Sequence, residues 1–143
     1  MRKYSCLFAL FFTVSLIRAQ VVGSIKDSTC IPKPDLLDNQ QVYVTADKNA
    51  EFPGGQSALM RYVQNNLRYP KEQENYQGAI YATFIVDTLG NIRNECIYKH
   101  YFSSGESPLE RVTLNLIKDM PAWTPAKKDG KKVYMRITLP IKF

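Results

Sequence analysis

The stretch from Lys132 to Phe143, at the end of the chain, most strongly constrains what the sequence can fold into. Apolar side chains stand at every second position there, and polar or charged side chains fall between them. This two-residue period is typical of a β-strand with one buried face. Pro140 lacks a backbone N–H, so from that residue the strand can pair fully on only one side. The sequence therefore predicts a C-terminal edge strand that another strand could join.

Residues 1–19 have the pattern of a secretory signal peptide. A positively charged start precedes an apolar run that ends at Ile17, and Ala19 supplies a small residue before a predicted cleavage ahead of Gln20. A helix over residues 4–17 would reach only about 20 Å, short of the roughly 30 Å hydrocarbon core of a membrane. We expect cleavage and export, with membrane association only if the segment is retained.

The rest of the chain divides into a linker or tail at residues 20–41 and one domain at residues 42–143. The tail is polar, contains two prolines and shows little periodicity. Of the net charge of +6, three units belong to residues 1–19, which leaves +3. Lysines near the C-terminus could face an acidic partner or could protect a strand edge from aggregation. Nucleic acid is a poor fit, because the basic residues are not interleaved with stacking aromatic residues.

The domain alternates between helical and strand periods. A break rich in proline and glycine at residues 51–55 precedes apolar residues spaced by three and four, which predict a helix that Pro70 ends. Strands at residues 80–86 and 92–98 flank a tight turn and form a hairpin. Ser107 caps a second helix. The order is short strand, helix, hairpin, helix, strand.

These elements predict an α+β fold. Three strands are amphipathic, and each of the two helices is apolar along one stripe. The economical packing is a small three-stranded antiparallel sheet with two helices packed on one face. Pro140 favours a sheet edge for the last strand.

Catalytic and metal-binding patterns are missing from the sequence. The chain has one histidine and three cysteines, of which Cys6 would leave with the signal peptide. Cys30 and Cys96 remain in an oxidising compartment, where they could form a disulfide or stay apart. Cys96 and His100 have no acid placed to orient the imidazole, so nucleophilic catalysis is not indicated. We expect no enzyme activity, no metal and no cofactor.

Seven short motifs follow one another between residues 42 and 143. They are Glu51–Gly55, Tyr69–Pro70, Gln77–Gly78, Asp87–Gly90, Met120–Pro125, Gly130 with Val133, and Pro140–Phe143. No single motif is specific, but taken together and in this order they resemble the C-terminal domain of TonB, the energy transducer of Gram-negative outer-membrane transport.

The resemblance implies a binding module whose last strand accepts the short Ton box peptide of a receptor as an added strand. The implied partner is a TonB-dependent outer-membrane receptor or another TonB-like domain in the periplasm, and a homodimer through the same edge is a further expectation. Tyr69–Pro70 could equally be a helix stop with a buried ring, and Trp123 is better explained by core packing than by stacking on a peptide. The implied partner-binding residues are Arg68, Tyr69, Pro70, Val133, Tyr134, Met135, Arg136, Ile137 and Thr138.

Two departures from the family pattern shape the expected function. The stretch after Tyr69–Pro70 is shorter than usual, and Arg68 stands where transducers often carry glutamine. A complete transducer also needs a membrane anchor and a long spacer, whereas residues 20–41 would reach only about 70 Å fully extended. We therefore expect an exported, stand-alone domain that modulates transport. The alternative is a full energy transducer with residues 4–17 retained as its inner-membrane anchor.

Overall fold

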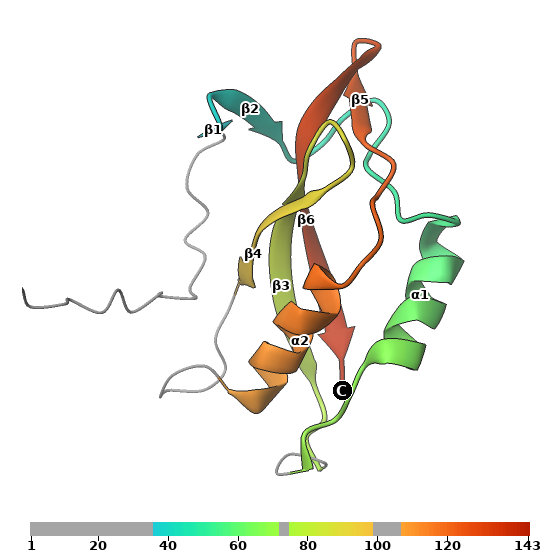
Figure 1. Ribbon diagram of the computed structural model, residues 1–143, viewed down its shortest axis with the longest axis vertical. Coiled ribbons are helices and arrows are strands. Elements are labelled where there is room, and N and C mark those ends of the chain that lie inside the picture. Colours follow the sequence, from blue (N-terminus) through green and yellow to red (C-terminus); the bar gives the residue numbers. More distant parts are fainter. Residues whose placement is uncertain (1–35, 72–74, 99–106) are drawn as a thin grey trace, which may run out of the picture.

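The computed structural model describes residues 36–71, 75–98 and 107–143. In Figure 1, a long twisted sheet carries α2 across its face near β3, while α1 stands to the side of β6. The elements are β1 (Leu36–Leu37), β2 (Gln40–Tyr43), α1 (Gly55–Asn66), β3 (Ala79–Val86), β4 (Ile92–Ile97), α2 (Pro108–Lys118), β5 (Ala126–Lys128) and β6 (Lys131–Lys142).

The sheet is mixed and has six strands in the order β1-β2-β6-β3-β4, with β5 also paired to β6. Strand β3 is antiparallel to both β4 and β6, whereas β2 joins β6 in parallel. The predicted α+β class with two helices is therefore confirmed. The predicted three-stranded antiparallel sheet is wrong, because β1, β2 and β5 enlarge it. These strands have only two to four residues, too few to show a clear two-residue period.

The last strand is not a simple edge strand, contrary to the prediction. Its residues from Met135 to Lys142 pair with β3, its residues from Lys131 to Val133 pair with β5, and Tyr134 and Met135 pair with β2. The first half of β6 thus lies inside the sheet. The edge character inferred from Pro140 is restricted to the second half.

The core lies between the sheet and the helices. Alternate residues of β3 are buried against residues of both helices and against Trp123. Trp123 makes edge-on ring contacts with Phe52 and Phe84, at centroid distances of 5.8 and 5.3 Å. The Tyr62 hydroxyl donates to the Leu116 carbonyl at 3.1 Å and so joins α1 to α2. The interpretation of Trp123 as a core residue is confirmed.

Helix α2 begins with the predicted capping box. The Glu110 N–H donates to the Ser107 hydroxyl at 3.2 Å, and the Ser107 N–H donates to the Glu110 carboxylate at 2.8 Å. Pro108 occupies the first helical position, where its missing N–H costs no hydrogen bond. The capping box thus gives hydrogen-bond partners to backbone donors that the first turn of α2 would otherwise leave unsatisfied.

Candidate functional site

The second half of β6 has one paired side and one open side. Gly78 and Phe143 exchange two backbone hydrogen bonds, at 3.3 and 2.9 Å. Bonded and non-bonded pairs alternate along an antiparallel ladder, so Thr138, Pro140 and Lys142 direct their backbone groups away from β3. Pro140 is tolerated there because its missing N–H takes nothing from the ladder.

No strand in the described residues pairs with this side of β6 between Thr138 and Lys142. We call this stretch the open edge. Thr138, Pro140 and Lys142 are all exposed. Their outward-facing backbone groups form a template for a further strand.

Helix α1 runs beside the open edge (Figure 1). A groove of about 400 Å³ separates the two, and we call it the helix groove. Gln56, Met60 and Gln64 recur every fourth residue and line it from the helix side, so they share one face of α1. Met60 is 56 % exposed, a large apolar side chain beside an unpaired strand.

A second hollow, of about 360 Å³, adjoins the start of the open edge. We call it the indole pocket because Trp123 lines it. It lies between the segment Asn49–Phe52, the beginning of α1 and the β6 stretch Met135–Pro140. The Nε1 atom of Trp123 is buried and has no hydrogen-bond partner among the described residues.

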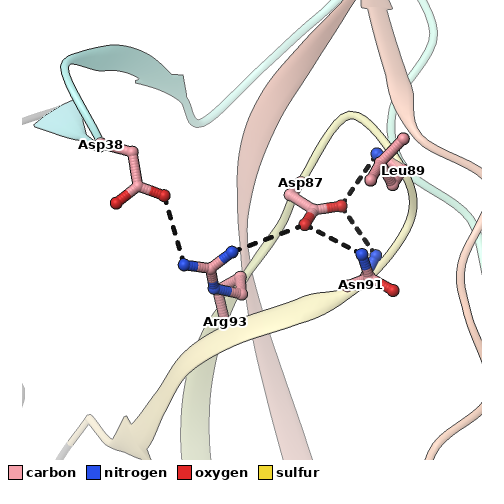
Figure 2. Close-up of polar contacts among 5 residues, drawn as sticks. All are labelled: Asp38, Asp87, Leu89, Asn91 and Arg93. Atoms are coloured by element: carbon pink, nitrogen blue, oxygen red, sulfur yellow. Dashed lines mark hydrogen bonds and ion pairs between the residues drawn. The ribbon is translucent and has the colours of Figure 1, made fainter.

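The turn between β3 and β4 fixes the backbone of Trp123. The Trp123 N–H donates to the Gly90 carbonyl at 2.8 Å. Gly90 has a φ of +94°, and an added Cβ there would collide with the Trp123 carbonyl oxygen. Figure 2 shows how Asp87 organises this turn: its carboxylate accepts from the Leu89 N–H at 2.8 Å and from the Asn91 N–H at 2.9 Å.

The same carboxylate connects the turn to the N-terminal strands. Burial alone would raise the pKa of Asp87, but hydrogen bonds from Asn91 and Leu89 and the charge of Arg93 outweigh it and lower that pKa. The Arg93 guanidinium lies 3.9 Å from the Asp87 carboxylate and 3.2 Å from the carboxylate of Asp38 (Figure 2). Asp38 stands in the turn between β1 and β2. These contacts link the turn between β3 and β4 to the turn between β1 and β2.

The structure places the predicted partner-binding residues of β6 at different kinds of position. Val133 pairs with β5, Tyr134 with β2, and Met135 with both β2 and β3. Ile137 bonds to β3 and lines the indole pocket, and Arg136 pairs with β3. Thr138 alone among them lies on the open edge. Their role in binding stays a prediction.

The predicted residues that follow α1 lie near the other end of the open edge. The Tyr69 ring packs edge-on against Phe143, with centroids 5.3 Å apart. Tyr69 is 44 % exposed, so its ring is not buried. Arg68 is exposed and Pro70 is partly buried.

The predicted partner-binding residues end at Thr138 and leave out both the end of the open edge and the wall of α1. Pro140 had indicated the edge, because a proline within a paired strand has to face the unpaired side. The four-residue spacing of Gln56, Met60 and Gln64 could have indicated the helix wall. Cys96 lies on β4 and is disulfide-bonded. Its possible partner Cys30 lies outside the described residues, so the pairing of these two cysteines stays open.

Residues 36–71, 75–98 and 107–143 contain no group of three or more His, Cys, Asp or Glu that could hold a metal ion. Within those same ranges, neither helix has the length and apolar character needed to cross a membrane.

The mixed sheet, the two helices and the open edge define a small α+β domain with a surface suited to binding an extended segment. A family model described as Gram-negative bacterial TonB protein C-terminal matches residues 65–143. Because this match covers more than half of the chain, the protein belongs to that family. Such domains are periplasmic, act in TonB-dependent transport and generally interact with outer-membrane receptors. No curated protein and no solved structure matches the chain.

Proposed function

We propose that this domain is an exported, non-catalytic module that binds an envelope partner by strand addition at the open edge. The partner is the Ton box of an outer-membrane receptor or another TonB-like domain. The observation that carries the proposal is the set of backbone groups that Thr138, Pro140 and Lys142 direct away from β3, in a chain whose family interacts with such receptors.

Backbone hydrogen bonds would supply most of the affinity. An added strand can bond to the N–H and C=O groups of Thr138 and Lys142, and each bond contributes about 0.5–1.5 kcal/mol net. Part of this gain offsets the entropy lost when a flexible peptide becomes ordered. The expected affinity is therefore modest. Pro140 offers only a carbonyl, which restricts the register that the added strand can take.

A Thr138→Pro substitution tests strand addition directly. It removes an N–H donor from the open edge and leaves the backbone bonds to β3 in place. Pro140, two residues further on, also directs its backbone groups away from β3, so the strand already accepts proline at such a position. Thr138→Ala is the matched control, since it keeps the N–H. With a fluorescent Ton box peptide, anisotropy should show at least about tenfold weaker binding for Thr138→Pro, equivalent to about 1.4 kcal/mol, and little change for Thr138→Ala.

Equal binding by wild type and a folded Thr138→Pro variant would exclude strand addition at this edge. The export part of the proposal has a separate test, which is the N-terminus of the mature protein by mass spectrometry. An N-terminus at Gln20 supports the exported module. Retention of residues 4–17 would instead support the full transducer with an inner-membrane anchor.

A further inference from the structure

Three exposed lysines lie side by side on adjoining segments, at the end of the sheet away from the C-terminus (Figure 1). Lys127 pairs with Lys132 across the β5–β6 hairpin. On its other side, Lys127 pairs with Lys48 in an isolated antiparallel bridge. Residues directly opposite each other on neighbouring strands direct their side chains to the same face of a sheet. We call these three residues the lysine row.

The backbone hydrogen bonds bring the side chains of the lysine row close together. The Lys48 N–H donates to the Lys127 carbonyl at 3.1 Å, and the Lys127 N–H donates to the Lys48 carbonyl at 2.8 Å. Because Lys127 uses its backbone groups on that side, Lys127 and Lys132 form a non-hydrogen-bonded pair, whose Cα atoms are only about 4.5 Å apart. Like charges directly opposite each other destabilise a sheet. The fold therefore holds three ammonium groups together although their repulsion opposes folding.

No carboxylate among the described residues forms an ion pair with the lysine row. The ion pairs in this part of the chain join Arg93 to two aspartates and Lys118 to Glu95. Asp47 and Asp129 are close to the row in the sequence, but the Asp47 carboxylate accepts from the Asp129 N–H at 2.7 Å instead. The row therefore presents positive charge to the solvent.

Protection of a strand edge does not account for the lysine row. Edge-protecting lysines act where a strand has unpaired backbone groups, but Lys127 is paired on both sides. The same pairing leaves no backbone template at Lys127 for an added peptide. Lys132 and Thr138 are separated along β6 by about 20 Å, at roughly 3.3 Å per residue. The row is thus a surface distinct from the open edge.

The side-chain chemistry of the hairpin indicates which anion fits. Residues 126–134 contain four lysines and no arginine. Arginine has the planar fork that matches a carboxylate with two hydrogen bonds, whereas lysine presents a compact point charge on a flexible stem. Lysine binds phosphate in this point-charge mode. A broad surface that carries many phosphates could approach all three ammonium groups of the lysine row at once.

We propose that the lysine row docks this domain onto an anionic phospholipid surface, with its ammonium groups against lipid phosphates. Domains of this family are periplasmic, so membranes bound the compartment in which the docking would occur. Each lysine near such a surface should strengthen binding about fivefold, which gives weak and reversible attachment. The proposal goes beyond strand addition and does not depend on it. A docked domain would keep its open edge, at the other end of β6, available to a peptide.

Vesicle sedimentation tests the docking with the exported protein. Vesicles of phosphatidylglycerol and phosphatidylcholine supply the anionic surface, and vesicles of phosphatidylcholine alone supply the neutral one. We expect binding to the anionic vesicles only. Binding should be lost at 1 M salt, where the screening length falls to about 3 Å. All variants share one N-terminus, so any contribution of residues 1–19 cancels.

A triple variant with Lys48→Gln, Lys127→Gln and Lys132→Gln removes the charges of the lysine row. It should bind anionic vesicles about 100-fold more weakly than the wild type, from three contributions of about fivefold. Because the substitutions also remove repulsion between neighbouring lysines, its thermal unfolding temperature at low salt should be no lower than that of the wild type. A loss of vesicle binding by this variant would thus not reflect unfolding.

A control variant removes three positive charges from other parts of the surface and has the same net charge. Its binding to anionic vesicles should stay within about threefold of wild type, because charges beyond a screening length of about 10 Å at 0.1 M salt act weakly. The substitutions are Arg61→Gln, Lys71→Gln and Arg111→Gln, all at exposed residues.

The outcomes keep this proposal separate from strand addition. No binding of wild type to anionic vesicles, or equal losses in the two triple variants, would overturn docking through the lysine row. Binding of soluble polyglutamate without binding of vesicles would also overturn it, in favour of an acidic polypeptide. Thr138→Pro should leave vesicle binding unchanged, so a failure of strand addition would not affect this result.

Discussion

The two halves of β6 have the same side-chain alternation but different neighbours. In the first half, β5 and β3 pair with one side of the strand while β2 pairs with the other. In the second half, from Thr138 to Lys142, only β3 pairs with it among the described strands. The alternation of apolar and polar side chains along a strand therefore indicates which face of the strand is buried. It does not indicate how many strands pair with its two edges.

Short segments decide which half is closed. Strand β2 contributes only a two-residue pairing to β6, but its Val42 is 4 % exposed and anchors it by burial. Around it, contacts are weaker: Arg93 pairs with Asp38 on the surface, and the Lys128 ammonium lies 5.6 Å from the centre of the Tyr43 ring. We therefore expect the first half to be closed by packing, with the charged contacts adding little.

The largest expected effect comes from proline substitutions at neighbouring positions of β6. Ile137→Pro would remove an N–H that bonds to β3 and leave a buried carbonyl unmet, which should cost on the order of 3 kcal/mol or more. Thr138→Pro removes an outward-facing N–H and should cost much less. Urea unfolding of both variants measures the difference. Equal losses of stability would show that the two sides of β6 are not distinct.

The sequence predicted those parts of the fold that are long enough to show a regular spacing of apolar residues. The helix over Pro108–Lys118, the hairpin and the final strand all follow from apolar spacing and capping residues. The parallel joining of β2 could not be predicted, because it depends on a contact between Val42 and Tyr134, far apart in the chain. Short strands carry too few residues to specify a partner.

The candidate site was predicted only in part, for the same reason. Thr138 lies on the open edge, whereas Val133, Tyr134 and Met135 pair with β2 or β5, which the sequence did not indicate. The indole pocket depends on tertiary contacts among Asn49–Phe52, α1 and β6. A local sequence pattern cannot reveal that the Trp123 Nε1–H lacks an acceptor among the described residues. Whether a buried donor finds a partner depends on how the whole chain folds.

An intermediate effect is expected from Asp87→Asn, which weakens the turn that holds both Arg93 and Trp123. At neutral pH the loss of acceptor strength toward the Leu89 and Asn91 N–H groups should cost about 1–3 kcal/mol. Because folding lowers the pKa of Asp87, its contribution is complete above the unfolded value near 4. It is lost as the pH falls through the lowered folded value.

Urea unfolding of wild type and Asp87→Asn at pH 7, 4 and 2.5 checks this dependence. The difference in unfolding free energy between the two proteins should be constant down to about pH 4 and should shrink below it. A difference that stays constant to pH 2.5 would show that the ionised carboxylate does not stabilise the turn.

The smallest expected effect comes from Asp38→Asn, which removes only the ion pair between β1–β2 and β4. Asn tolerates the left-handed conformation at this residue, where φ is 51°, so the backbone should not change. The two side chains are 54 % and 45 % exposed, and exposed pairs contribute about 0–1 kcal/mol. Global stability should therefore stay within about 0.5 kcal/mol of wild type.

Amide hydrogen exchange can detect a local loss of stability in β2 that the global unfolding free energy does not show, because β2 can open without the rest of the sheet. At low salt, the Tyr43 amide on β2 should exchange up to about fivefold faster in Asp38→Asn, since 1 kcal/mol corresponds to about that factor. The Leu139 amide, which bonds to β3 in the second half of β6, is the internal control and should not change. High salt should erase the difference by screening the pair in wild type. An unchanged Tyr43 rate at low salt would show that the burial of Val42 alone keeps the first half of β6 closed.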